Sequence, residues 1–161
     1  VSVLPKKLKI NTVELMENKL YFVGSSRMEL KNKASKRQLF EELPLIFREP
    51  GSATRNAMEA FLAKIRLPAQ KKIALTSNEA VKQAVIAGLG CSIMPLIGIK
   101  NELKNNDLQI IPVTGLPIST TWNLIWLKSK ALSPAAEAFL EYLEEEKKRI
   151  IADDFGWIKE Y

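Results

Sequence analysis

The chain has 161 residues, 47% hydrophobic and 26% charged, which is typical of one globular domain or two small lobes with a core. It contains one cysteine and no histidine, so an internal disulfide, a Ser-His-Asp triad, a Cys-His pair and a histidine metal site are all excluded. The net charge of +6 comes from scattered basic residues, which favours a solvated surface over a nucleic-acid groove and is compatible with a small anionic ligand.

The first third of the chain predicts extended structure. Residues 8–24 indicate two stretches around Glu17-Asn18, because apolar side chains alternate and then form a denser run. Residues 25–37 are polar and predict a loop, and residues 38–42 predict a short helix. LPLIF (43–47) predicts a short buried strand. No apolar run is long enough to cross a membrane and no signal peptide is visible, so we expect a cytoplasmic protein.

Helices and strands alternate between residues 43 and 113, which indicates an α/β fold with a largely parallel sheet. The helices are expected at 53–66, where Leu67-Pro68 ends the first one, at 77–88 and around 97–104. The strands are expected at 71–76, 91–95, 108–113 and, beyond this region, 120–128. Cys91 lies in the apolar run GLGCSIMP, and we expect a buried side chain rather than a reactive thiol.

Ser133-Pro134 predicts the start of a helix over 134–150, with serine as the cap and proline in the first turn. The residues expected to be buried by this helix are Ala135, Ala138, Phe139, Tyr142 and Leu143. Its outer face is expected to carry the ion pairs Glu144–Lys148 and Glu145–Arg149. The tail that follows contains Phe155, Trp157 and Tyr161, which are candidates for packing on a neighbouring lobe or subunit.

Two helix starts gather polar residues where a parallel sheet often binds ligands. In REPGSATR, Gly51 permits unusual backbone angles, Ser52 or Thr54 can cap the helix, and Arg55 adds a positive charge. An ion pair of Arg55 with Glu49 or Glu59 is the structural alternative to ligand contact.

In the second helix start, TSNEAVKQAVIAGLG, Thr76 and Glu79 fit a capping box, which leaves Ser77 and Asn78 to face a ligand. Gly88 predicts a left-handed end to this helix. The Gly88-Leu89-Gly90 stretch is not a nucleotide-binding loop, because it follows a helix rather than opening one.

Three segments in order, FREPGSATR, SNEAVKQAVIAGLGCSIMP and LSPAAEAFLEYL, resemble the effector-binding domain of LysR-type transcriptional regulators over the chain to about residue 150. The resemblance implies an α/β fold of the type II periplasmic-binding-protein kind, in which two lobes hold a small ligand between them. Residues 1–24 and 122–161 would form an incomplete first lobe, and residues 25–121 the second lobe. LYFVG (20–24) and WNLIW (122–126) would cross between them. The family's winged helix-turn-helix is absent from this chain, so DNA would be contacted only through that missing domain.

The resemblance also implies a set of second-lobe contacts to the effector: Ser52, Thr54, Arg55, Thr76, Ser77, Asn78 and Pro95. It implies no catalytic residue, metal or cofactor, and a homodimer or higher homo-oligomer. The effector would be a carboxylate or another small anion. Ala53 stands where peroxide-sensing members have a reactive cysteine, so a thiol switch is not expected. Two alternatives remain, a solute-binding protein of a transport system and an enzyme using Glu49 with Arg55.

Overall fold

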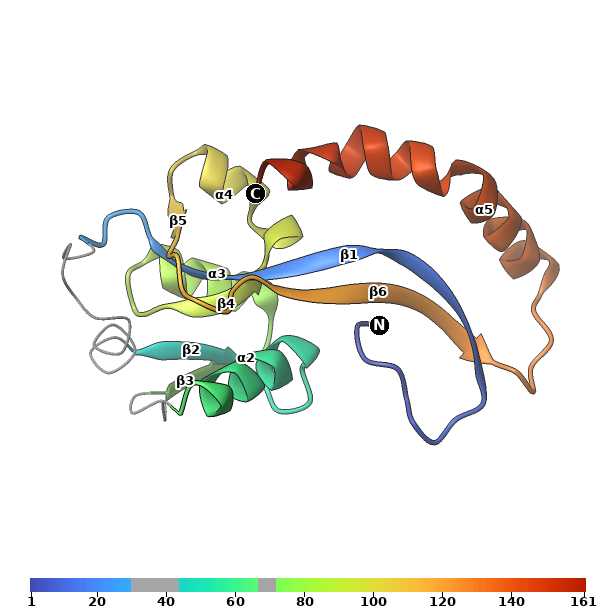
Figure 1. Cartoon of the computed structure of the whole chain (residues 1–161), viewed down its shortest axis with the longest axis horizontal. Helices are drawn as coiled ribbons and strands as arrows, with labels where there is room; N and C mark the ends of the chain where they lie inside the picture. Colours follow the sequence, from blue (N-terminus) through green and yellow to red (C-terminus); the bar gives the residue numbers. More distant parts are fainter. Residues whose placement is uncertain (30–43, 67–71) are drawn as a thin grey trace. The chain divides into compact units, whose positions relative to one another are not determined.

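The computed structural model describes residues 1–29, 44–66 and 72–161 (Figure 1). The chain divides into two compact units. Unit 1 comprises Val1–Asn18 and Thr120–Tyr161, and unit 2 comprises Lys19–Ser119. The unit boundaries fall inside two long strands, β1 (Ile10–Ser25) and β6 (Ile118–Leu127), which pair with each other. The assignment of the chain to two lobes of a ligand cleft stays a prediction. The expected helix at 38–42 and the helix-ending Leu67-Pro68 lie outside the described residues.

Unit 2 contains a parallel pair of strands, β2 (Leu45–Arg48) and β3 (Lys72–Leu75), whose ends Arg48 and Leu75 are in register. The next strand, β4 (Ser92–Pro95), joins them through a parallel bridge between Leu45 and Cys91. These strands are connected by helices, and a helical crossover is what places successive strands parallel. The predicted α/β pattern is therefore present in this part of the unit.

The expectation of a largely parallel sheet is wrong for the rest of unit 2. β1 pairs antiparallel with β4, where Leu20 faces Pro95, and antiparallel with β5 (Leu108–Ile110), where Val23 faces Ile110. Unit 2 thus combines parallel and antiparallel pairing, with β1 lying between β4 and β5.

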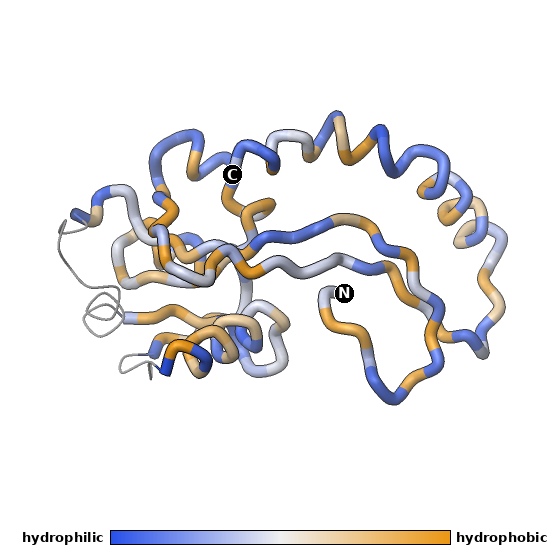
Figure 2. Tube along the Cα trace, in the orientation of Figure 1, coloured by the Kyte–Doolittle hydropathy of each residue, from blue (hydrophilic) through white to orange (hydrophobic). Residues whose placement is uncertain are grey.

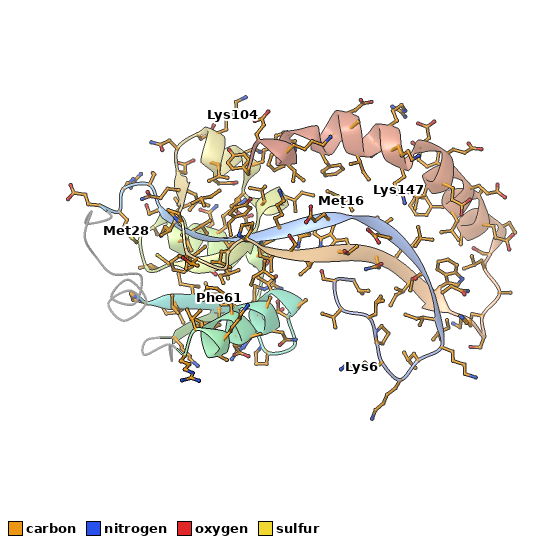
Figure 3. All side chains as sticks on the ribbon, viewed as in Figure 1. Lys6, Met16, Met28, Phe61, Lys104 and Lys147 are labelled. Carbon is orange, nitrogen blue, oxygen red and sulfur yellow. The ribbon has the colours of Figure 1, made fainter. Side chains whose placement is uncertain are left out.

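The helices of unit 2 are α2 (Ala53–Lys64), α3 (Asn78–Ile86), the 3-10 helix η1 (Leu96–Gly98) and α4 (Lys100–Lys104). The single helix expected around 97–104 is thus two short ones. The buried face of α2 consists of Met58, Phe61 and Leu62, as its helical spacing predicts. Phe61 is labelled on this helix in Figure 3. α3 ends at Ile86, and Gly88 just beyond it has the expected left-handed φ, +78°. A Cβ at Gly90 would lie 2.2 Å from the Pro44 carbonyl oxygen, so the chain needs glycine there.

β1, which runs from unit 1 into unit 2, is one continuous strand rather than two stretches around Glu17-Asn18. The Asn18 amide donates to the Thr120 hydroxyl at 3.2 Å, and that hydroxyl donates to the Asn18 carbonyl oxygen at 3.1 Å. Two polar residues on neighbouring strands therefore satisfy much of each other's hydrogen bonding without a turn. The polar Asn18 in the middle of β1 suggested a break in the strand. Its hydrogen-bond partner Thr120 is 102 residues away, so the sequence near Asn18 does not reveal it.

The C-terminal helix α5 (Pro134–Phe155) begins as predicted, with the Ser133 hydroxyl accepting from the Ala136 amide at 3.3 Å and proline in the first turn. It continues five residues beyond the expected end and is followed by the 3-10 helix η2 (Gly156–Glu160). Hydrophilic and hydrophobic residues both occur along its length (Figure 2). In η2 and the terminal residue, the Trp157 and Tyr161 rings meet edge to face at 6.3 Å.

The burial expected for α5 is wrong, since none of its residues is buried by the described part of the chain. Phe139 and Tyr142 are 52% and 49% exposed. The predicted ion pairs are also wrong, because Arg149 contacts Glu146 and Asp153 rather than Glu145, and Glu144 and Lys148 form no ion pair. Within residues 1–29, 44–66 and 72–161, no helix has the length and apolar character needed to span a membrane.

Candidate functional site

The two predicted helix starts lie at one edge of the strands of unit 2. β2 and β3 are parallel and end together at Arg48 and Leu75. β4 runs parallel to β2 from the Cys91 bridge and ends at Pro95. Because carboxyl ends of parallel strands meet at the same edge, the starts of α2 and α3 and the end of β4 gather there. A hydrogen bond from the Arg48 guanidinium to the Asn78 side chain joins the end of β2 to the start of α3.

The start of α2 is open. Ser52 occupies the N-cap position with extended backbone angles, yet its side chain forms no capping hydrogen bond. Gly51 has a φ of +91° and open space beside its Cα. Neither Ser52 nor the half-buried Thr54 caps the helix, so the predicted capping role of these hydroxyls is wrong. The first backbone N–H groups of α2 therefore keep their capacity to bind an anion.

Arg55 is engaged in structural contacts. Its Nε lies 2.9 Å from a Glu59 carboxylate oxygen, one helical turn ahead, and its Nη1 donates to the Arg48 carbonyl oxygen at 3.0 Å. Its guanidinium also lies 5.7 Å from the centre of the Phe47 ring. The ion pair with Glu59 that was the alternative to ligand contact is present. Arg55 therefore ties the first turn of α2 to the end of β2.

Arg48 is the site residue that sequence reasoning missed. Its Nε and Nη2 donate to the two carboxylate oxygens of Glu49 at 2.7 and 2.8 Å, and its Nη1 donates to Asn78 Oδ1. The hydrogen bond from Arg48 lowers the pKa of the Glu49 carboxyl, and the charge of Arg48 acts in the same direction. One feature of the sequence could have pointed to Arg48: it is a charged residue that directly follows the apolar run LPLIF and precedes Glu-Pro-Gly.

The start of α3 is closed by Ser77, not Thr76. The Ser77 hydroxyl accepts from the Ala80 amide at 3.0 Å, which corrects the predicted capping box. Glu79 does not reach back to the cap, because its carboxylate contacts Lys82 at 2.9 Å and accepts from Gln83 at 2.9 Å further along the helix. Thr76, Ser77 and Asn78 are exposed, whereas Pro95 is buried.

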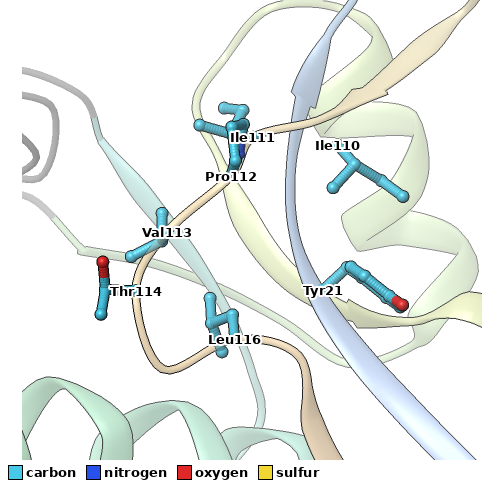
Figure 4. Close-up of a pocket in the computed structure, with 7 residues that line it drawn as sticks. All are labelled: Tyr21, Ile110, Ile111, Pro112, Val113, Thr114 and Leu116. Atoms are coloured by element: carbon cyan, nitrogen blue, oxygen red, sulfur yellow. The ribbon is translucent and has the colours of Figure 1, made fainter.

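A pocket of about 540 Å³ also lies in unit 2 (Figure 4). Its lining residues are Tyr21, Ile110, Ile111, Pro112, Val113, Thr114 and Leu116. They come from β1, the end of β5 and the connection that follows it. The pocket therefore shares no lining residue with the seven predicted effector contacts, and volume alone does not point to those contacts.

A family model described as LysR substrate binding domain matches residues 5–148. The chain belongs to this family. The HTH-type transcriptional activator CmpR of Synechocystis sp. is 42% identical over 141 residues, covering 86% of this chain and 46% of CmpR. A RuBisCO operon transcriptional regulator of Allochromatium vinosum is 36% identical over 152 residues, covering 93% of this chain and 50% of that protein. The chain thus spans about half the length of these relatives.

A solved structure of a regulatory domain has a similar fold. The Synechocystis PCC6803 CcmR regulatory domain, in complex with 2-PG, is similar with a TM-score of 0.81 and 29% identity. The match covers 92% of this chain and 72% of the CcmR chain. The predicted α/β fold of the type II periplasmic-binding-protein kind is confirmed, as is the predicted membership in the LysR family.

Proposed function

We propose that this effector-binding domain senses a small anion at the edge where β2, β3 and β4 end, and that the whole protein regulates transcription. The observation that carries the binding site is the open start of α2, where Ser52 makes no capping bond, four residues after Arg48, whose guanidinium bonds to Glu49 and Asn78. Unpaired N–H groups and the helix dipole attract negative charge. The description of the CcmR domain as a complex with 2-PG supports a small molecule as the effector class.

The seven predicted contacts take different roles in this proposal. Ser52 and Thr54 supply hydroxyl groups next to the α2 amides. Asn78 supplies its amide N–H₂, since its Oδ1 accepts from Arg48. Thr76 and Ser77 supply exposed hydroxyl groups, and the Ser77 hydroxyl keeps its own proton to donate while accepting from Ala80. Arg55 contributes charge and holds the strand end in place, and Pro95 shapes the floor.

The relatives favour regulation over the two alternatives. CmpR and the A. vinosum protein are named as regulators of transcription rather than as transport proteins or enzymes. We therefore propose a binding role without catalysis and a cytoplasmic location, where such a regulator meets DNA. Contact with DNA would be made by a part of the whole protein outside this chain. We also propose that the protein works as a homo-oligomer.

Thermal-shift and calorimetric titration of the full-length gene product with 2-PG, inorganic phosphate, citrate and malonate tests the proposal. At least one anion is expected to raise the melting temperature in a saturable way, because it binds the native state. Ser52→Ala is expected to weaken that anion about two- to tenfold, the effect of one lost hydrogen bond. The melting temperature without ligand is expected to stay nearly unchanged, because the Ser52 side chain forms no cap.

Ser129→Ala is the matched control, because it removes an exposed serine hydroxyl from a turn outside the site. It is expected to bind like wild type. The proposed function fails if no anion in the panel gives a saturable shift. The placement of the site fails if Ser52→Ala and Ser129→Ala bind the same anion equally well.

A further inference from the structure

Arg48 is the cation at the end of β2, and its side-chain donors bond to neighbouring side chains. Two of its nitrogens form a fork on the Glu49 carboxylate, and a third donates to Asn78. Glu49 belongs to the turn before α2, and Asn78 is the first residue of α3. The Arg48 side chain is 18% exposed and the Glu49 side chain 35%, so the pair lies at the surface of the site and not in the core.

The fork has the geometry with which arginine recognises a ligand carboxylate or phosphate. Glu49 therefore presents to Arg48 the same planar pair of oxygens that an anionic effector would present. An exposed ion pair of this type changes an equilibrium by only about two- to fivefold. Replacing the Glu49 carboxylate by the carboxylate of a ligand therefore costs little free energy. Gly51, with its φ of +91° and open surroundings, lies two residues further along the same turn.

Arg55 does not fit this role, although its charge is equal. Its guanidinium is divided among Glu59, the Phe47 ring and the Arg48 carbonyl oxygen. These contacts hold the backbone from which the Arg48 side chain projects. Arg55 is thus a positioning residue, and removing it would disturb the strand end as well as the charge.

We propose that Glu49 is an internal substitute for the effector, occupying the Arg48 fork in the free domain until an anion takes its place. This inference rests on the proposed function, because it concerns the same site. Release of Glu49 frees the turn at Glu49-Pro50-Gly51, immediately before the open end of α2. The measured affinity for an anion is then the difference between two occupants of one guanidinium, so Glu49 sets the concentration at which the domain responds.

The test is calorimetric titration of the full-length gene product with the same four anions, comparing wild type with substitutions of this pair. Glu49→Gln keeps the side-chain size but removes the competing charge, and is expected to lower the Kd about two- to fivefold. Arg48→Gln is expected to raise the Kd about tenfold or more. Arg48→Lys keeps the charge but loses the fork, and is expected to fall between Arg48→Gln and wild type.

Glu29→Gln and Lys64→Gln are the matched controls, because each removes one charge of the same sign from an exposed position of unit 2. Both are expected to bind like wild type, which separates a local effect from a change in net charge. Melting temperatures without ligand show that each variant is folded.

The outcomes distinguish the two proposals. If neither wild type nor Glu49→Gln binds any anion, the proposed function fails and this inference falls with it. If wild type binds but Glu49→Gln binds no more tightly, Glu49 is not a competitor and only this inference is overturned. Wild-type affinity in Arg48→Gln overturns it as well. Tighter binding by Glu49→Gln together with weaker binding by Arg48→Gln supports it.

Discussion

Ser77 and Thr76 are neighbours with the same hydroxyl chemistry, yet only Ser77 closes the start of α3. Ser77→Ala is expected to reduce the free energy of unfolding by about 1 kcal/mol, because the Ala80 amide loses its partner. Thr76→Ala is expected to cost less than about 0.5 kcal/mol, as an exposed substitution outside the helix. Urea denaturation of both variants measures the difference. Equal losses would mean that the cap is shared or that it lies at Thr76.

At the residue scale, sequence patterns predict where a helix starts better than they predict which side-chain atoms bond there. The pattern REPGSATR correctly predicted a helix start after a strand, because glycine, serine and the preceding apolar run are local features, and anion binding there stays a proposal. It did not show that the guanidinium of Arg48, rather than that of Arg55, bonds to the start of α3. That choice depends on Asn78, Glu59 and the Phe47 ring, which become neighbours only when the chain is folded.

At the scale of elements, Cys91 connects the parallel and antiparallel parts of unit 2. Its backbone bonds to Pro44 and to Ile46 at 2.9 and 2.8 Å, and it leads into β4, which pairs with β1. The Cys91 side chain is fully buried. Burial raises the pKa of its thiol from 9.0 to about 12, which agrees with the predicted unreactive thiol.

The sign of this pKa shift predicts an alkaline loss of stability. The folded state keeps the thiol neutral above pH 9, whereas the unfolded state ionises it. The thiol's contribution is therefore complete below pH 9 and is lost as pH rises from 9 towards about 12. Urea midpoints of wild type are expected to fall more steeply than those of Cys91→Ala above pH 9. Other alkaline groups cancel in this comparison, so parallel curves would contradict the burial of the thiol.

The elements that sequence periodicity predicted best are those whose partners are close in the chain. β2, α2, β3 and α3 follow one another in the chain, where β2 pairs with β3 and each of the two helices buries an apolar face. α5 shows the limit of the method. Its spacing of apolar residues predicted a helix correctly, but burial requires a covering surface, and the described residues leave Phe139 and Tyr142 about half exposed.

At the scale of the whole molecule, the hydrophobic core is unevenly divided. Every buried hydrophobic residue of the described chain, from Leu20 to Ile111, belongs to unit 2. In the described part of unit 1, the one residue classed as buried is Asn18, whose Oδ1 accepts no hydrogen bond. Because stability follows buried apolar area, we expect unit 1 to open at a lower free energy than unit 2.

Hydrogen exchange followed by mass spectrometry measures this difference in one experiment on this chain. Amides of α5 are expected to exchange at least about tenfold faster than those of α3, because α5 has no buried residue while α3 buries Val81, Ala84 and Val85. α2, which also packs on the core, serves as a second reference from unit 2.

Repeating the measurement over a range of protein concentrations separates two causes of slow exchange. Protection of α5 that rises with concentration would show a second copy covering Phe139 and Tyr142, in agreement with a homo-oligomer. Protection equal to that of α3 at every concentration would contradict the uneven stability of the two units.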